Sequence, residues 1–592
     1  MAQAAIVLLS PAASLGSTVS IFGITVATSA GLTIAGSLLS AGVSLAVTAA
    51  LTPDIGGIRA SDQQANFQES VSPRLVIVGR AKVGGAKVTI RQTSDKLYIL
   101  LVQGHRQITS REKHYVDGRE VTLNSSGIIT DPDKYENDEG NIFLQILHRD
   151  GEVPSTNYDE LEADFPDWDE THRLDGLATA LLIHEAPSLK RFNKVFPDRT
   201  VRYNSLTQGI EVFDPRTSLT SWTENPVLII RDYIINSDEL SSLGVDDTLF
   251  SIAADVCDEV FPTANGSDVR YRIGGTYSLT DDHQANLQAM ANTCDGEIFI
   301  TTEGEWGIRA GGNIDPTFTI DSKHIISVQI SNGPSALDAY TTLKSDYTDE
   351  DLDYVTETID PWVQDSLVTR YGHEIVRDDF SLRMVPSHHQ ARRLSKRRII
   401  SDNPIYKGVL RTNLHGLQAL GERWLNVNLD YEFAGINYSG PARIEDISFS
   451  GGAIDRPDSL SYVDITFSIL DPSYDQWDLS EEGQKPLPVL PDDEEDLPIP
   501  TGLSAVGAPV NGGAGILVSW DLQPYSSLNP VVEYKPSTSS TYESRTLTAQ
   551  TTSEEIGGLT DGASYDVRVA FEGPSGTFSE YSTLTSVLAS NT

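Results

Sequence analysis

Cysteine is scarce in this sequence, with only Cys257 and Cys294 among 592 residues. Two cysteines are far too few for the disulfide framework that holds small secreted domains together. We therefore expect two buried free thiols in a chain that folds in a reducing compartment.

Charged side chains are absent from residues 1–53, which contain no Asp, Glu, Lys or Arg. A secretory signal begins with a basic region, so this segment does not match one. A membrane-spanning helix needs about 20 strongly apolar residues, whereas Ser, Thr, Gly and Pro11 interrupt the apolar runs here. Small residues at this density favour close packing between helices. We predict that residues 1–53 form short helices.

The motifs of common enzyme and metal sites are also missing. His184-Glu185 and His373-Glu374 begin like a zinc motif, but Ser188 and Arg377 stand where the second histidine would complete the metal-binding face. The sequence has no Gly-x-x-x-x-Gly-Lys loop to bind a phosphate and no Gly-x-Ser-x-Gly turn to present a serine nucleophile. We therefore predict no catalytic residue, no metal ligand and no cofactor.

Three acidic stretches are candidates for cation or sugar binding. Asp131-x-Asp133 and Asp349–Asp353 lack the sixth-position Gly and twelfth-position Glu of a helix–loop–helix calcium site, so we expect solvated loops. Asp159–Glu170 surrounds Trp168 with carboxylates, a composition that a glycosidase also uses. Spacing along one loop does not establish such a site, and we expect a solvated loop or a subunit contact.

The abundant feature is negative charge: 84 Asp and Glu against 43 Lys and Arg give a net charge of −41. Such a chain repels nucleic acid, so stable DNA binding is not expected, whereas a conduit through which DNA passes is compatible with it. One basic run, Arg392–Arg398, lies in a predicted helix over Ser387–Ile399. We expect this helix to dock against an acidic neighbouring surface of the same assembly rather than against DNA. His388-His389 on this helix point about 100° apart and do not form one ligand face.

The apolar pattern predicts a mainly β chain with α+β insertions. Alternating or continuous apolar runs at Ala86–Thr93 and Leu97–Val102 indicate strands, and Asp117-Gly118 is a favoured hairpin dipeptide. Helical spacing occurs at Pro226–Ile235, Leu249–Val260 and Asp281–Asn292. The predicted units are an uncharged apolar segment (1–53), a β-rich domain (54–200), an α+β domain (201–330), a β-rich domain (331–483), an acidic Pro-rich linker (484–500) and a β-sandwich (501–592).

The C-terminal unit resembles a fibronectin type III domain. Ile516–Trp520 matches its second strand with the core tryptophan, and Val531–Tyr534 matches its third strand. Leu559–Val569 matches the strand of the tyrosine corner, in which the phenol hydroxyl of Tyr565 would satisfy a nearby backbone group. This likeness indicates a fold and says little about function.

Two further stretches carry a second resemblance. Val212–Arg216 followed by Ser221–Tyr233 forms an Asp-Pro-Arg turn before a Trp-containing Asn-Pro helix start, where Asn225 can cap and Pro226 fits the first turn. Arg270–Thr276 precedes a helix, and a Gly-bearing turn and the hairpin that ends at Trp306–Gly311 follow it. With the uncharged N-terminal segment and the terminal module, these stretches resemble the tip attachment protein (protein J) family of lambda-like phage tails.

The resemblance implies a multidomain tail hub and not an enzyme. In the family, a homotrimer closes the distal end of a long non-contractile tail tube in the virion and opens for DNA ejection. Such a protein, made in the host cytoplasm, would contact the distal tail protein ring, the tape-measure protein and other tail-tip or fibre proteins, with DNA only in transit. Relatives often continue for hundreds of residues beyond this point, so the resemblance does not assign receptor binding to this polypeptide.

Two other functions stay open from the sequence. The terminal module could make the chain a host-surface adhesin that binds a glycan or a protein, and a cell-wall hydrolase on the tip is a third reading. Residues 1–53 are expected near the three-fold axis, either as a permanent plug or as a segment that enters the host envelope on opening.

Overall fold

The computed structural model divides into two compact units, Met1–Gln484 and Lys485–Thr592. It is 45% strand and 17% helix, which confirms the predicted mainly β fold class. Both cysteines are buried and free, as predicted. The described residues are 18–21, 24–27, 64, 66–67, 73–132, 135, 142–188, 192, 195–196, 199–264, 266–334, 338–431, 436–450, 461–487, 497–573 and 577–592.

The described part of the N-terminal segment is a hairpin. Strands β1 (Thr18–Ile21) and β2 (Ile24–Ala27) pair antiparallel. The prediction of helices is therefore wrong for these residues, because β-branched residues such as Val19, Ile24 and Val26 favour a strand. The rest of residues 1–53 lies outside the described residues, so their plug or membrane role stays a prediction. Among the helices that are described, none combines the length and apolarity that crossing a bilayer requires.

Two five-stranded sheets share the first hydrophobic core, which includes Leu101, Val116 and Tyr203. The predicted hairpin turn is confirmed, since Asp117 and Gly118 both have positive φ angles, 52° and 85°. Helix α4 (Asp159–Asp164) lies between strands of the second sheet in the sequence. In sheet order the strands are β10 (Ile129–Asp131), β9 (Arg119–Leu123), β8 (Ser110–Val116), β13 (Tyr203–Gln208) and β5 (Arg80–Val83), and then β11 (Leu144–Asp150), β12 (Leu177–Glu185), β7 (Lys96–His105), β6 (Gly85–Gln92) and β3 (Asn66–Phe67).

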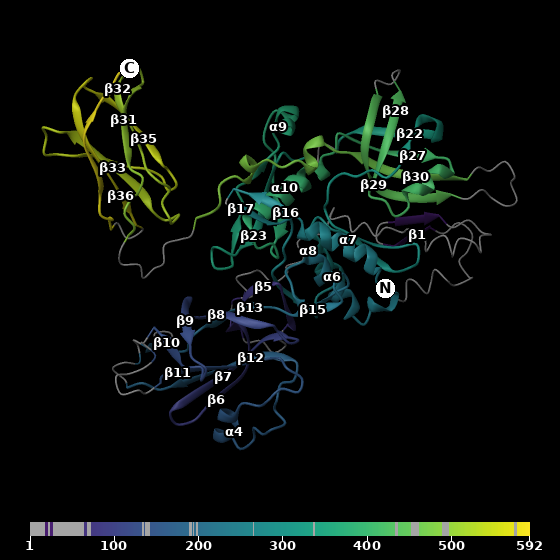
Figure 1. The fold of residues 1–592 in the computed structure, drawn as a ribbon, viewed down its shortest axis with the longest axis horizontal. Helices are drawn as coiled ribbons and strands as arrows, with labels where there is room; N and C mark the ends of the chain where they lie inside the picture. The colour runs from purple at the N-terminus through teal and green to yellow at the C-terminus, as the bar shows by residue number, and fades with distance from the viewer. Residues whose placement is uncertain are drawn as a thin grey trace. The chain divides into compact units, whose positions relative to one another are not determined.

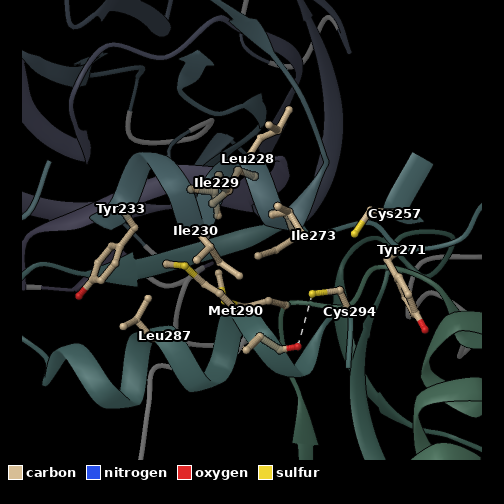
Figure 2. Packing of buried hydrophobic residues seen from close by; sticks show 14 of the residues in the cluster. Leu228, Ile229, Ile230, Tyr233, Cys257, Tyr271, Ile273, Leu287, Met290 and Cys294 are labelled. Carbon is tan, nitrogen blue, oxygen red and sulfur yellow. Dashed lines mark hydrogen bonds between the residues drawn. The ribbon is translucent and has the colours of Figure 1, made fainter. Parts of the chain in front are cut away.

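Three helices and four short strand pairs form the next region (Figure 1). Asn225 caps the first helix by accepting hydrogen bonds from the backbone N–H groups of Val227 and Leu228, and Pro226 occupies the first turn, as the sequence predicts. Figure 2 shows Leu287 and Met290 of the third helix packed beneath the first helix. The elements are α6 (Pro226–Ile235), η2 (Ser241–Leu243), α7 (Asp247–Asp258), α8 (His283–Asn292) and the pairs β4 (Leu75–Val78) with β18 (Gly275–Ser278), β14 (Glu211–Asp214) with β15 (Leu219–Trp222), β16 (Val260–Thr263) with β17 (Gly266–Val269), and β19 (Glu297–Ile300) with β20 (Trp306–Arg309).

A six-stranded sheet and a four-stranded sheet complete the first unit. The six-stranded sheet runs β21 (Thr319–Ile320), β28 (Trp424–Tyr431), β29 (Ile436–Ser450), β30 (Tyr462–Ile469), β27 (Tyr406–Thr412) and β22 (Ile325–Asn332), and the smaller sheet contains β23 (Thr342–Asp349), β24 (Val355–Thr358), β25 (Trp362–Val363) and β26 (Val376–Leu382). The helices are α9 (Asp365–Tyr371), α10 (His388–Asp402) and the short η3 (Ser322–His324), η4 (Leu414–Ala419), η6 (Pro472–Asp475) and η7 (Leu479–Glu482).

The second unit is a β-sandwich with a tyrosine corner. Trp520 is buried in its core, and the hydroxyl of Tyr565 accepts a hydrogen bond of 3.2 Å from the backbone N–H of Thr560, as the sequence predicts. One sheet contains β31 (Ser504–Val510), β32 (Gly513–Ser519) and β35 (Ser553–Leu559), and the other contains β34 (Glu543–Thr546), β33 (Asn529–Pro536), β36 (Ser564–Glu572) and β37 (Ser582–Leu588).

Replacing the corner tyrosine tests this assignment. Tyr565→Phe removes the acceptor for the Thr560 N–H and should lower the free energy of unfolding of the second unit by about 1 kcal/mol. Calorimetry of the full chain should show a lower midpoint for that unit's transition only. Tyr525→Phe, in the same module but outside the corner, is the control; equal effects of the two substitutions would contradict the corner's role.

Candidate functional site

The residues that resembled a zinc motif do not come together. His184 is buried in β12, where burial lowers its pKa to about 4, whereas His373 is exposed just after α9. Within the described ranges, no group of three or more His, Cys, Asp or Glu side chains is placed to hold a metal ion.

The solvated-loop prediction is wrong for Asp349 and Glu350 of the acidic stretch Asp349–Asp353, whereas Asp351 is exposed. Asp349 is fully buried and accepts a hydrogen bond from the Tyr347 hydroxyl. Glu350 binds the guanidinium of Arg272 at 2.9 Å, and Asp353 pairs with the buried Lys82. These carboxylates therefore offset cations from other parts of the chain. Asp133 of the other candidate loop lies outside the described residues.

The solvated-loop prediction is also wrong for the core-facing side of Asp159–Glu170. Leu161 and Trp168 are buried in a cluster with Tyr98 and Tyr158. The indole of Trp168 is 7% exposed, so it is not an open platform for a sugar ring. Its neighbouring carboxylates stay at the surface, as the charge pattern indicates.

Helix α10 is the most basic element of the chain, and it is buried. Its cations contact acceptors in the same chain: Arg392 donates to the Glu481 backbone carbonyl (3.0 Å), Arg393 to the Arg270 carbonyl (2.5 Å), Lys396 to the Glu481 carboxylate (2.7 Å), Arg397 to Asp295 (2.9 Å) and Arg398 to Asp402 (2.9 Å). The helix faces protein, as predicted, but the surface that it faces belongs to the same chain and not to a neighbouring one. Apart from Asp402, these partners lie 85 to 123 residues away in sequence, so the local pattern could not identify them.

Asp295 joins four segments of the first unit. It lies in the turn between α8 and β19 with a positive φ of 48°. Its carboxylate accepts hydrogen bonds from Arg397 (2.9 Å), Arg423 (3.2 Å) and the Tyr474 hydroxyl (2.8 Å). Burial opposes ionisation of this carboxyl, but Arg423, Arg397 and the Tyr474 bond outweigh it and lower its pKa to about 2. Asp295 therefore stays charged at every physiological pH.

A second charge network surrounds Glu224, next to the capped helix α6. Burial raises the pKa of Glu224, and Arg272 and Arg80 partly offset that rise from 3.9 and 3.6 Å. Arg272 also pairs with Asp268 at 3.0 Å, and Asp268 accepts a contact of 3.1 Å from the Nε2 atom of His389. His389 is therefore part of this charge network.

An open cleft of about 450 Å³ lies beside the Asp349–Asp353 stretch. Tyr115, Leu206 and Tyr354 pack together as its apolar floor. On its rim, Glu120 pairs with Lys113 at 2.9 Å, and Asp353 pairs with Lys82. Glu120 and Asp353 are thus each paired with a lysine, and Glu350 of the same cleft binds Arg272.

Comparisons with known proteins give no family. No family model and no curated protein matches the chain. A chain of the structure titled "Virion of native gene transfer agent (GTA) particle" is similar over 75% of this chain and 94% of that chain, with 11% identity and a TM-score of 0.47. The fibronectin type III domain of human collagen XX is similar over 17% of this chain and 100% of its own, with 22% identity and a TM-score of 0.13. No assignment follows from these likenesses.

Removing the charge of Asp295 tests its structural role. Asp295→Asn leaves Arg397 and Arg423 without their carboxylate, which costs about 3–5 kcal/mol in a fully buried pair. Because the Asp295 side chain is 26% exposed, we expect a loss of about 2 kcal/mol in the free energy of unfolding. Denaturant unfolding of the full chain measures it, with the exposed Asp238→Asn as the control. Equal stability of the two variants would contradict the assignment.

The same substitution predicts a pH dependence. The folded-state pKa of Asp295 is about 2, below the ordinary value of about 3.9, so its contribution is present above that ordinary value and is lost as pH falls towards 2. The stability difference between wild type and Asp295→Asn should therefore be constant from pH 7 to 5 and shrink between pH 4 and 2. Unfolding titrations at each pH provide the measurement. A difference that grew on acidification would rule out an ionised Asp295.

Proposed function

We propose that this chain is a structural protein of a phage virion, the central tail-tip hub of a long non-contractile tail. One observation carries the proposal. The two stretches that resemble the tip attachment family, 212–233 and 270–311, fold into a single hydrophobic core: Val212 and Ile230 from the first share it with Tyr271, Ile298 and Ile308 from the second (Figure 2 shows Ile230 and Tyr271). The resemblance therefore concerns one folded unit rather than scattered motifs.

The use of charge in the described residues supports a structural role and not an enzymatic one. Cations of α10 and the carboxylates of Asp295 and Glu481 are held in fixed pairs between distant segments. The net charge of −41 supports a conduit, because DNA that passes an acidic wall is not retained by released counterions.

The proposed place is the distal end of the tail, where a homotrimer with pseudo-hexameric symmetry would join a hexameric ring to a single tip. Its partners there would be the distal tail protein ring, the tape-measure protein and other tip or fibre proteins. DNA would pass only in transit.

One observation favours a second function alongside the hub. The terminal module belongs to a compact unit, Lys485–Thr592, whose first residues are those of the acidic Pro-rich stretch at 484–500. Proline stiffens such a stretch, and like charges extend it. This arrangement suits a module that binds a glycan or a protein on the host surface.

Oligomeric state is the direct test of the hub. Purified protein or detached tail tips should contain particles at three times the chain mass of 64.5 kDa by mass photometry. Three-fold averages in electron micrographs of the same tips provide the second reading. A monomer within assembled tips would contradict both the proposed trimer and the proposed hub function.

The terminal module should be dispensable for assembly. Deleting residues 497–592 leaves the first unit and its cores intact, because the module is a separate compact unit with a core of its own. Tails of normal length and number should form in cells that make the truncated chain, while host adsorption falls if the module is an adhesin. Absence of tails would show that the module is built into the ring.

A further inference from the structure

Residues 476–484, which we call the strap, form the last segment of the first unit. The strap contains η7 and follows η6, whose Tyr474 is buried in the core and bound to Asp295. It contacts α10 through Glu481, whose carboxylate binds Lys396 at 2.7 and 2.9 Å and whose backbone carbonyl accepts from Arg392 at 3.0 Å. The Gln476 carbonyl accepts a further bond of 2.8 Å from Lys396. The strap thus supplies the acceptors for two cations of α10.

Two tryptophan rings close over the same lysine. Trp477 of the strap stacks against Trp362 with ring centroids 6.3 Å apart. The ammonium group of Lys396 lies 5.3 Å from the Trp362 ring and 5.9 Å from the Trp477 ring. As a result the Lys396 side chain is only 3% exposed, and the strap is part of what covers it.

The end of the strap requires glycine. Gly483 has a φ of +70°, and a Cβ atom there would lie 2.4 Å from the Asp360 carboxylate and 3.1 Å from the Arg392 guanidinium. The next residue, Gln484, donates its backbone N–H to Asp360 at 3.3 Å. The strap is therefore seated closely against Asp360 and Arg392 at the point where the chain leaves the first unit.

The backbone hydrogen bond within the strap is a local turn, Glu481 N–H to the Asp478 carbonyl (2.9 Å). The strap is held on α10 by separate hydrogen bonds and ring contacts to single α10 side chains, which can break one after another. The strands of the terminal module are instead held by continuous ladders, such as β33 with β36. Regions without such ladders open at a lower free energy than the sheets around them.

We propose that the strap is a releasable clasp: tension on the terminal module withdraws residues 476–484 from α10 before either unit unfolds, and uncovers Lys396 and Arg392. The clasp deepens the proposed hub function, on which it rests for the source of tension, a module engaged at the host surface. When the strap is released, tension on the module exposes a basic surface of the first unit, close to the Asp295 carboxylate that binds Arg397.

Lysine labelling tests the seat of the strap in the full chain. Short pulses of an acetylating reagent should leave Lys396 (3% exposed) and Lys82 (4%) unmodified in the wild type, while Lys323 (72%) reacts fully. In the double variant Trp477→Ala, Glu481→Gln, modification of Lys396 should rise at least fivefold with Lys82 unchanged. The exposed Glu303→Gln is the control and should match the wild type. Unchanged labelling of Lys396, or a joint rise of Lys396 and Lys82, would overturn the clasp.

Single-molecule stretching tests release under tension. The full chain is held at Thr592 and at a cysteine introduced at the exposed Ile252 (58%) of α7. The first rupture should lengthen the chain by roughly 30 Å, the extended span of the strap, before the terminal module unfolds, and Gly483→Ala should lower its force. A first event as long as a whole module would overturn the proposal. Because these readings use isolated single chains, their failure is distinct from failure of the trimer.

Discussion

Positive charge on α10 must be neutralised inside the protein, because a guanidinium or ammonium group taken out of water is costly unless a partner accepts its hydrogen bonds. The partners come from segments that lie far apart in sequence: Asp295 in the α8–β19 turn and Glu481 in the strap. Satisfying these cations fixes where the two segments can lie. The helix therefore acts as the electrostatic centre of the first unit, although its side chains are those of a surface helix.

The need to neutralise buried cations also explains residues that resemble functional sites in the sequence. The carboxylates of Glu350 and Asp353 resemble a cation loop, yet they match Arg272 and Lys82 of the protein itself. His389 belongs to no ligand face, and it contacts Asp268. Because the chain has a net charge of −41, cations are few, and acidic residues lie around those that are buried. Carboxylate density here marks internal pairing rather than a reactive centre.

Features that depend on residues close together in the sequence could be predicted from the sequence. The cap at Asn225, the hairpin at Asp117-Gly118 and the tyrosine corner at Tyr565 each depend on neighbours within a few residues, and each is present. The burial of α10 could not be predicted, since a run of arginines indicates an exposed face and its partners are distant in sequence. The burial of Trp168 could not be predicted for a related reason: acidic residues surround it in the sequence, and core neighbours such as Tyr98 lie far away along the chain.

Strand β4 pairs with β18, and the two strands are about 200 residues apart. Val76 and Val78 of β4 are buried in the core formed by α6, α7 and α8, although the residues that follow them belong to the first pair of sheets. During synthesis, β4 leaves the ribosome long before its partner exists, and its apolar side chains have no place to bury until β18 has emerged. The two regions must then close together, so a nascent chain halted between them would expose an unpaired apolar strand to chaperones and to other copies of itself.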